Sequence, residues 1–374
     1  MAQSTRLVDL VHSRIDEFIN TRESIVTTIG PDLAVLVEFS RQFLSGGKRF
    51  RAQFAHLGWQ SVPAATAHRI PAAPDGESGT GLAGLVSAAS ALEIFHAAAL
   101  VHDDIIDNSD TRRGAPAAHR RFESLHNSQG WAGNPGDFGR SSAILLGDLL
   151  LGWSDELLDE GLDDAPDRAS ARRARAEFNR MRTEVTAGQY LDILEEQAWI
   201  TQAESELLGR AVRVIVFKSA KYSVQAPLVI GAALAGADDQ HLEALRAFGL
   251  PLGIAYQLRD DLLGVFGDAA VTGKPSGDDL REGKRTVLIA LARQQLASAD
   301  LATVDRLLGR PDLSAEQISA LQRTILDSGA VERVEAMIQE NVAEALAVLA
   351  GSPVETGVAV RLTEFAGTVT RRVY

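Results

Sequence analysis

Helical periodicity of the apolar residues is the feature that most constrains this chain. Leu7, Val11 and Ile15 recur every fourth residue, which places their side chains on one face of an α-helix. The same kind of spacing recurs over residues 242–248 and through residues 314–351. Alanine, the strongest helix former, is abundant, whereas alternating runs of β-branched residues are scarce. The sequence therefore predicts an all-α fold.

Two segments interrupt the helical pattern. Residues 62–81 and 127–140 are rich in glycine, proline, serine and asparagine, which is typical of loops. Helical patterning of the same character resumes after each of them, so neither has the properties of a linker between domains. A chain of 374 residues is also within the range of one large helical domain. We therefore predict a single all-helical domain over residues 1–374 with two long loops.

Composition excludes several classes of protein. The formal net charge is −13, so the basic surface that a nucleic-acid partner requires is not expected. The chain has no cysteine, which excludes disulfides, zinc–thiolate sites and cysteine nucleophiles. The N-terminus lacks the uninterrupted apolar core of a signal peptide, and the longest apolar run, which begins at Ala226, is too short to span a membrane. We expect a cytoplasmic protein with no membrane span.

The stretch LVHDDIIDNSDTRRG places three carboxylates at the end of an apolar segment. On a helix, Asp103 and Asp107 lie one turn apart on one face, with Asp104 beside them. The alternative is a solvated acidic surface, but the preceding HAAALVH offers little to keep this end in water. Hard oxygen ligands suit Mg²⁺, which bridges to phosphate oxygens. Arg112 and Arg113 would then clamp the same anion.

A second acidic pair lies on another apolar, helical stretch. The segment YQLRDDLLGVFGD carries Asp260 and Asp261. Two acidic helices that face each other across a cavity repel, but divalent ions and a diphosphate between them make the arrangement attractive. The acidity of the chain is therefore compatible with an anionic substrate.

Basic residues occur in two glycine-containing segments. In SGGKRFR, Lys48 and Arg51 follow a glycine pair that allows close approach of the backbone. Lys274 and Lys284 lie in VTGKPSGDDLREGKRT, after the second acidic pair. The first segment alone could be an ordinary solvated turn. The second could be a mobile flap over the site or merely a surface loop.

Together these motifs resemble those of the trans-isoprenyl diphosphate synthases. GGKRFR, the first aspartate motif, GQYLD (188–192), KSA (218–220), YQLRDD and GKPSGDDLREGKRT follow the order found in that family over nearly the whole chain. One DDxxD motif is common by chance, whereas this ordered set is not. The resemblance implies the isoprenoid synthase fold, a bundle of long helices around a deep central cavity, usually assembled as a homodimer.

The resemblance also implies a role for each matching residue. Three Mg²⁺ ions per active site are expected, two with the first acidic motif and a third with the second. Without the family, His96 could be a buried structural histidine and Ser219 an ordinary helix residue. The implied metal ligands are Asp103, Asp104, Asp107, Asp260 and Asp261; Arg112, Lys218 and Lys274 contact the allylic diphosphate; Lys48, Arg51, His96 and Arg113 hold isopentenyl diphosphate; Lys284 assists in substrate binding; and Ser219, Gln257 and Gln189 lie near the developing cation.

Three positions depart from the family pattern. Gly264 stands where the second motif usually has its last aspartate. We expect water to take the place of that carboxylate and the change Gly264→Asp to be tolerated. Ser219 replaces the usual threonine but keeps the hydroxyl, and Ala52 replaces a common proline. Of the three departures, only Gly264 affects an implied functional residue.

The implied activity is condensation of isopentenyl diphosphate with dimethylallyl, geranyl or farnesyl diphosphate, with release of diphosphate. In the family, the residues four and five before the first aspartate close the tunnel for the prenyl tail. Here they are Ala99 and Ala98, and the next large side chain is Phe95, about one turn or roughly 5 Å further. This predicts mainly geranylgeranyl diphosphate. The alternatives are a farnesyl or longer product, with the alanines serving only helix packing.

Three other functions are alternatives to an elongating synthase. A terpene cyclase also ionises a prenyl diphosphate at DDxxD, but it has no need of GGKRFR or of the second aspartate pair. A non-catalytic subunit of a heteromeric synthase tends to lose its aspartate motifs, whereas here the first motif is whole. A purely structural bundle has no need of this order of acidic and basic residues. An elongating synthase is favoured.

Overall fold

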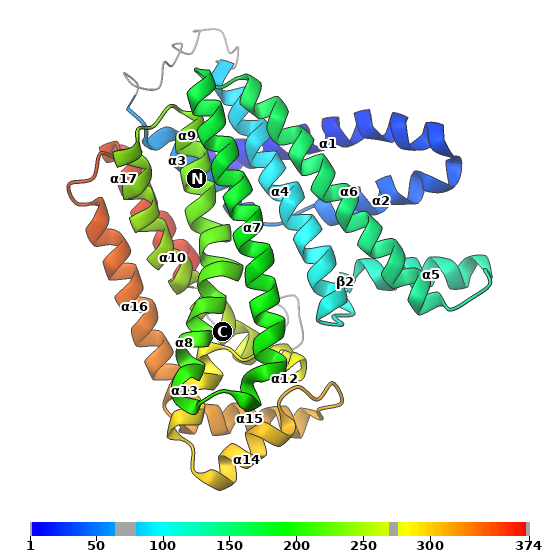
Figure 1. Cartoon of the computed structure of the whole chain (residues 1–374), viewed down its shortest axis with the longest axis vertical. Helices are drawn as coiled ribbons and strands as arrows, with labels where there is room; N and C mark the ends of the chain where they lie inside the picture. The colour runs from blue at the N-terminus through cyan, green and yellow to red at the C-terminus, as the bar shows by residue number, and fades with distance from the viewer. Residues whose placement is uncertain (1, 64–79, 269–275, 372–374) are drawn as a thin grey trace. The chain divides into compact units, whose positions relative to one another are not determined.

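The computed structural model describes residues 2–63, 80–268 and 276–371 (Figure 1). Nearly all of these residues are helical. The described strands are β1 (Thr111–Arg112) and β2 (Ala115–Pro116), which pair antiparallel. The all-α prediction is therefore confirmed. Residues 64–79 of the loop predicted at 62–81, and Lys274, lie outside the described residues.

The chain divides into two compact units, Met1–Ala176 with Pro227–Leu242, and Glu177–Ala226 with Glu243–Tyr374. The prediction of one domain over residues 1–374 stays a prediction. The helices of the first unit are α1 (Ala2–Ile29), η1 (Pro31–Leu33), α2 (Ala34–Leu44), α3 (Phe50–Ser61), α4 (Thr80–Ile106), α5 (Ala118–Gln129), α6 (Pro135–Asp163), the start of α7 (Arg168–Ala198), α9 (Ala226–Leu234) and the first residues of α10 (Asp239–Phe266).

Helix α4 is the core helix of the first unit. It packs extensively on α6, and the two backbones meet at Gly84 and Gly161. A Cβ atom at either glycine would lie 2.7 Å from the carbonyl oxygen of the other, so no larger residue fits. The close approach explains how the alanine-rich α4 is buried on several sides.

The apolar length of α4 corrects one expectation from the sequence. Residues Gly81–Ile106 are long and apolar enough to cross a membrane, with a mean hydropathy of 1.6, so the run that begins at Ala226 is not the longest. Of the most apolar window, 83% is buried inside the structure. Within the described ranges, α4 is the one helix that is long and apolar enough to cross a membrane. Its burial is typical of a core helix.

The long loop predicted at residues 127–140 is also wrong. Helix α5 continues to Gln129 and ends at Gly130, whose φ of 63° suits a glycine. Helix α6 begins after Asn134, whose side chain accepts from the backbone N–H of Gly136 at 2.8 Å. Pro135 is the first helical residue, where its missing N–H costs nothing. Glycine, proline and asparagine here mark two helix ends that lie close together.

The second unit is built around α10 and α13. Apolar residues of α10, among them Leu258 and Leu262, pack in one cluster with those of α13, such as Val287 and Leu288. Helix α13 spans Val287–Gln295. The other helices of this unit are the end of α7, η2 (Trp199–Thr201), α8 (Glu204–Val214), the π-helix η3 (Ile215–Gln225), α12 (Asp278–Glu282), α14 (Ser298–Leu307), α15 (Ala315–Asp327), α16 (Ala330–Leu349) and α17 (Thr356–Thr370).

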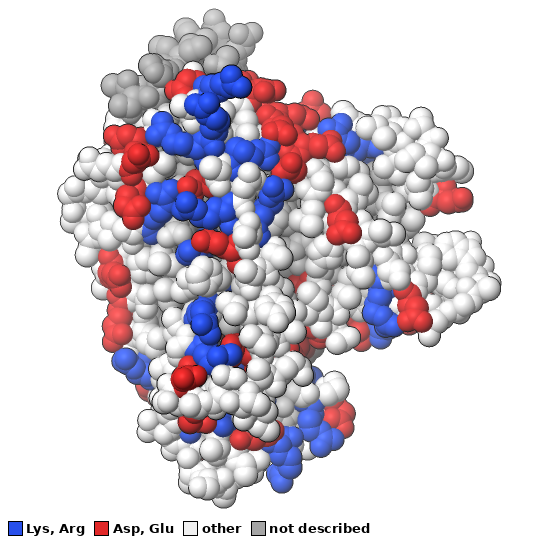
Figure 2. Space-filling view, viewed as in Figure 1, with Lys and Arg blue, Asp and Glu red and all other residues white. Residues whose placement is uncertain are grey.

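Surface charges of opposite sign are interspersed. Figure 2 shows lysine and arginine side chains lying among aspartate and glutamate side chains on the face drawn there. Within the first unit, for example, Arg175 of α7 pairs with Asp155 of α6 at 2.7 Å. Such pairs on a surface contribute little to stability but break up any continuous basic area.

Candidate active site

The first aspartate motif lies at the C-terminal end of α4. The N–H of Asp107 still donates to the carbonyl oxygen of Asp103 at 2.8 Å, so the helical geometry extends through the motif. Asn108 then adopts a left-handed conformation, with φ of 53°, and ends the helix. Asp103 and Asp107 are partly exposed and lie one turn apart, whereas Asp104 is fully buried. Two of the three aspartates therefore keep partial access to solvent.

A tight hairpin returns two arginines to this motif. Strands β1 and β2 pair Arg112 with Ala115, and the turn residues Arg113 and Gly114 both have positive φ, as in a type I′ turn. Arg112 Nε donates to Asp104 Oδ1 at 2.8 Å, and Nη2 contacts the same oxygen. Nη2 also lies 3.5 Å from Asp103 Oδ2. Arg112 is thus engaged with the acidic motif and holds Asp104 in place.

Arg113 points toward the glycine-containing segment that precedes α3. Its Nη1 donates to the carbonyl oxygen of Ser45 at 3.3 Å. A Cβ atom at Gly47 would lie 3.2 Å from Arg113 Nη2, so the guanidinium rests against the glycine backbone. Gly47 has φ of 87°, which also favours glycine. The structure therefore joins Arg113 to the SGGKRFR segment, and their shared role in holding isopentenyl diphosphate stays a prediction.

A buried ion pair shapes this segment, although little in the sequence indicates it. Arg49 has left-handed φ of 52°, is 4% exposed and lies 3.2 Å from Glu93 of α4. Glu93 Oε1 also accepts from the N–H of Ala52 at 3.2 Å. The pair fixes the start of α3 and thereby the positions of Lys48 and Arg51. The sequence signal for this ion pair is Glu93, a charged residue inside the apolar run of α4.

His96 lies among the arginines of the first unit. Burial and the positive charges of Arg51 and Arg113, followed by those of Arg112 and Arg49, hold the pKa of His96 well below its usual value. The imidazole is therefore neutral at neutral pH and has one donor and one acceptor nitrogen. Arg51, His96 and Arg113 form the basic cluster of this unit.

The residues predicted to set chain length differ in exposure. Ala98 is fully buried and Phe95 is 4% exposed, whereas Ala99 is partly exposed. Because Ala99 lies one turn before Asp103 and Phe95 two turns before it, these three share one face of α4. Ala98 lies one turn from Phe95 but is turned away from Asp103. Of the two alanines, Ala99 is the one aligned with the aspartate motif.

The second aspartate pair lies on α10 in the second unit. Asp260 is exposed, whereas Asp261 is 5% exposed and accepts from Gln257 Nε2 at 2.8 Å. Burial raises the pKa of Asp261 to about 8, and the charges of Asp279 and Asp260 also raise it, while Lys284 lowers it. A carboxyl with this pKa is largely protonated at neutral pH until a cation binds beside it.

The KSA motif lies on the π-helix η3. π-helices are rare and occur frequently at functional sites. Lys218 forms an ion pair with Asp192, the last residue of GQYLD, a partner that the sequence did not identify. A Cβ atom at Gly188 would lie 2.8 Å from the Cα atom of Lys218, so α7 and η3 approach backbone to backbone. This contact brings Gln189, which follows Gly188 in sequence, to the segment that carries Lys218 and Ser219.

Comparison with known proteins identifies the family. The model of the polyprenyl synthetase family matches residues 34–325. The chain belongs to the polyprenyl synthetase family. It is 38% identical to a crystallised geranylgeranyl pyrophosphate synthase from Corynebacterium glutamicum, complexed with isoprenyl diphosphate and magnesium, with a TM-score of 0.89 over 98% of this chain and 99% of that one.

Proteins that this polyprenyl synthetase resembles in sequence are named as synthases of prenyl diphosphates. A geranylfarnesyl diphosphate synthase of Natronomonas pharaonis is 32% identical, over 87% of each chain. A geranylgeranyl diphosphate synthase of Methanosarcina mazei is 29% identical, over 86% of each chain. The resemblance seen in the motifs is thereby confirmed, and the protein is a prenyltransferase.

The space beside Gly264 is occupied by a side chain of the second unit. A Cβ atom at this position would meet the carboxylate of Asp279, whose Oδ1 would lie only 2.8 Å away. A carboxylate of the same unit therefore lies beside Gly264, and the expectation that water takes the outer position at the metal stays a prediction. Asp279 was not among the predicted site residues, although it stands in the GKPSGDDLREGKRT motif. Near it, Lys284 pairs with Glu282 at 2.7 Å.

The carboxylates are suitable ligands of Mg²⁺, but they do not form a complete coordination shell. Within residues 2–63, 80–268 and 276–371, no group of three histidine or acidic side chains is arranged to hold a metal ion by itself. Mg²⁺ in enzymes of phosphorylated substrates usually has one or two carboxylate ligands and several waters, with phosphate oxygens completing the shell. Asp261 Oδ2 is buried and has no hydrogen-bond partner in the structure, which fits such an ion.

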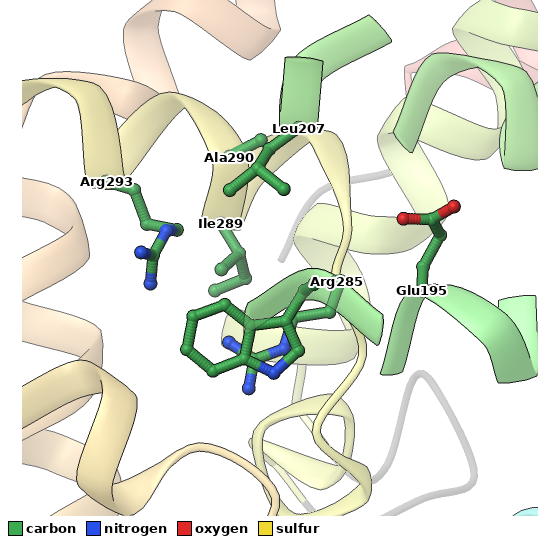
Figure 3. A pocket seen from close by; sticks show the side chains of 7 residues that line it. Glu195, Leu207, Arg285, Ile289, Ala290 and Arg293 are labelled. Carbon is green, nitrogen blue, oxygen red and sulfur yellow. The ribbon is translucent and has the colours of Figure 1, made fainter. Parts of the chain in front are cut away.

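One pocket of the second unit is lined by Arg285, which belongs to the GKPSGDDLREGKRT motif, and by residues outside the motifs (Figure 3). The centre of the Arg285 guanidinium lies 3.9 Å from the ring centroid of Trp199, and that of Arg293 lies 4.8 Å from it. Burial, together with the charge of Arg293, lowers the pKa of Arg285 to about 10. The pocket contains none of the predicted site residues.

Proposed function

We propose that this polyprenyl synthetase joins isopentenyl diphosphate head-to-tail to an allylic diphosphate, releases diphosphate, and forms mainly geranylgeranyl diphosphate. The names of its relatives support this class of substrate and this range of products. The alternatives are a farnesyl or a longer polyprenyl product, and a non-catalytic subunit of a heteromeric synthase.

One observation carries the proposal. The first unit combines an acidic motif and a basic cluster, and the adjacent residues Arg112 and Arg113 connect them. Arg112 pairs with Asp104, whereas Arg113 rests on Gly47 beside Arg51 and His96. Elongation needs two diphosphates to be held at once, one through metal ions and one by direct cationic contacts. A cyclase needs only the first of these.

Each group of residues has its own role in this reaction. Asp103 and Asp107 hold the allylic diphosphate through Mg²⁺, which stabilises negative charge on the leaving group. Lys48, Arg51, His96 and Arg113 hold isopentenyl diphosphate, and Lys218, Lys274 and Arg112 contact the allylic diphosphate. The allylic carbon–oxygen bond breaks, the double bond of isopentenyl diphosphate forms the new carbon–carbon bond, and the released diphosphate accepts the proton that is lost. Ser219, Gln257 and Gln189 direct oxygens toward the transient cation.

Finer properties belong to the same proposal. Three Mg²⁺ ions act in each active site, the third of them with Asp260 and Asp261. The protein is a cytoplasmic homodimer whose substrates are isopentenyl diphosphate and dimethylallyl, geranyl or farnesyl diphosphate. The acidic composition supports the expectation of no nucleic-acid partner, and the burial of α4 supports that of no membrane span.

Product analysis tests the proposal. Purified protein is incubated with Mg²⁺, labelled isopentenyl diphosphate and each of the three allylic diphosphates in turn, and the chain lengths of the products are measured. We expect labelled geranylgeranyl diphosphate with every primer and none after chelation of Mg²⁺. A hydrocarbon formed from an allylic diphosphate alone would show a cyclase, and no turnover with any primer would favour a non-catalytic subunit.

A further inference from the structure

Helix α1 contacts the segment that carries Lys48 and Arg51. The imidazole of His12, a partly buried residue of α1, lies with Nδ1 3.3 Å from Nη2 of Arg49. A guanidinium has only N–H donors, so Arg49 donates and the imidazole nitrogen accepts. In this contact His12 Nδ1 therefore carries no proton, and the ring carries its proton on Nε2.

Two hydrogen bonds hold α1 on α4 on either side of His12. The Oγ atom of Ser90, a fully buried residue, donates to the carbonyl oxygen of Val11 at 3.4 Å. Arg14 Nε donates to Ser87 Oγ at 3.0 Å. Because α1 is fixed along α4 at this level, the backbone of His12 has a defined position, and its side chain reaches Arg49 from there.

Arg49 depends on several partners to keep its conformation. Its φ of 52° lies in the left-handed region, which is costly for a residue with a side chain. Its buried guanidinium donates from Nη1 to Glu93 Oε2 at 3.2 Å and from Nη2 to the carbonyl oxygen of Leu44. His12 adds a third acceptor, and it does so from α1. The guanidinium is thus held between α1, the end of α2 and α4.

The buried Arg49 sets the direction of its basic neighbours. Lys48 is exposed and Arg51 is partly exposed, whereas Arg49 between them is buried. Glu93 Oε1 also accepts from the N–H of Ala52 at 3.2 Å, so one carboxylate contacts residues on both sides of Arg51. A displacement of the Arg49 guanidinium would therefore move both Lys48 and Arg51.

We propose that His12 is a positioning residue for isopentenyl diphosphate: as an acceptor for Arg49 it holds the buried guanidinium in place and thereby orients Lys48 and Arg51 toward the diphosphate. The role of Lys48 and Arg51 rests on the proposed function, whereas the contact between His12 and Arg49 rests on the geometry. His12 lies outside residues 34–325, which the family model matches. Helix α1 thus contributes to the substrate site from outside the conserved part of the family.

Two variants of His12 separate an acceptor from mere packing. In His12→Asn the side-chain oxygen lies close to the place of Nδ1, so an acceptor for Arg49 is kept. His12→Leu fills a similar space without an acceptor. Ser13→Leu is the matched control, because it places the same side chain at the next residue of α1, which is exposed. Thermal unfolding of each variant shows whether it is folded.

The readout is the KM for each substrate and kcat in the presence of Mg²⁺, together with binding of isopentenyl diphosphate to the full chain measured by calorimetry. We expect His12→Leu to raise the KM for isopentenyl diphosphate by about tenfold, the effect of one lost hydrogen bond to a charged group. Its kcat and its KM for the allylic diphosphate should stay near those of the parent, because only binding of one substrate is weakened. His12→Asn and Ser13→Leu should resemble the parent in all three values.

Nitrogen-15 NMR of the histidine rings tests the contact without reference to activity. The signals of His12 are identified as those that disappear in His12→Asn. In a mildly alkaline buffer we expect the proton on Nε2 alone, because Nδ1 accepts from Arg49. A proton on Nδ1 would overturn the inference even if His12→Leu did not fold.

An unchanged KM for isopentenyl diphosphate in folded His12→Leu would also contradict the inference, as would His12→Asn being as impaired as His12→Leu. A rise of both KM values together would show general damage to the fold instead of positioning. The two proposals fail in different ways. If the parent neither bound nor condensed isopentenyl diphosphate, the proposed function would fail and the inference with it. If the parent did both and His12→Leu matched it, only the inference would fail.

Discussion

At the scale of single residues, the three aspartates of the first motif are not equivalent. Asp104 is fully buried and held by Arg112, whereas Asp103 and Asp107 are partly exposed. A buried carboxylate with a guanidinium partner positions its neighbours, whereas Asp103, which Arg112 also approaches at 3.5 Å, and Asp107 keep part of their side chains accessible to a metal ion. The sequence identified the motif but assigned the same role to all three.

The variants Asp103→Ala and Asp104→Ala should separate these roles. Asp103→Ala should lower kcat by several orders of magnitude and leave the free energy of unfolding nearly unchanged, because a ligand is lost. Asp104→Ala should also lower the free energy of unfolding by about 3 kcal/mol, since it leaves the partner charge of a buried pair uncompensated. Steady-state kinetics and urea unfolding measure both effects. Equal stability of the two variants would contradict this assignment.

Asp261 should make the metal-free protein sensitive to pH. Its pKa is raised from 3.8 to about 8, so the folded state favours the protonated carboxyl. The resulting stability is fully present below the unfolded pKa near 4 and is lost as the pH rises through about 8. Asp261→Asn cannot ionise and should not show this loss. Urea unfolding in the presence of a chelator at pH 5 and pH 9 tests the difference, and parallel pH profiles would refute it.

At the scale of elements, one face of α4 connects the aspartate motif with chain length. Phe95, Ala99 and Asp103 follow one another at intervals of one turn, and Ala99 is partly exposed. Ala98 neighbours Phe95 but is turned away from Asp103, and it is fully buried. Of the two alanines that the sequence indicated, the structure therefore makes Ala99 the better place to test the length of the product.

Ala99→Phe should shorten the main product toward farnesyl diphosphate, because a ring there would block the growing tail. Phe95→Ala should lengthen it by about one isoprene unit, since one helical turn rises roughly 5 Å. Ala98→Phe is the control and should lower the melting temperature through overpacking. Chromatography of the labelled products gives the chain lengths. Products of unchanged length in both test variants would mean that another helix closes the tunnel.

Trp199 of η2 contacts the guanidinium groups of Arg285 and Arg293, and Arg293 belongs to α13. Arg293 also pairs with Glu204 at 3.0 Å and with Asp305, so this contact links η2, α8, α13 and α14. Trp199→Ala should lower the free energy of unfolding by about 2 kcal/mol, because it removes two cation–π contacts from a partly buried site. Trp199→Phe should retain most of the stability. Equal chemical denaturation of parent and Trp199→Ala would show that the contact is unimportant.

At the scale of the whole molecule, residues of α7 and α10 belong to both compact units. Helix formation is cooperative along a continuous helix, so melting in one unit should propagate into the other. We expect one calorimetric unfolding transition, as the single-domain prediction requires. Scanning calorimetry with and without Mg²⁺ and diphosphate measures this. Two resolved transitions would instead show two domains.

Local patterns in the sequence determined the fold class, the family and the position of each motif. Helical periodicity and capping act between residues a few positions apart, so Leu7 or Asp103 could be placed on a helix face without other information. The same patterns misjudged residues 127–140, because glycine and proline mark both loops and helix ends. The closeness of two helix ends is a matter of packing: a Cβ at Gly139 of α6 would lie 3.2 Å from the backbone nitrogen of Glu123 in α5.

Only the tertiary structure decided which members of each motif are available. It buried Asp104 on Arg112, formed the Arg49–Glu93 pair from residues 44 positions apart, and placed Asp279 beside Gly264. Each contact joins residues from different elements, and whether a side chain is buried, paired or open depends on those contacts. A sequence motif records which residues occur together, whereas their charge state and access to a ligand follow from packing between distant segments.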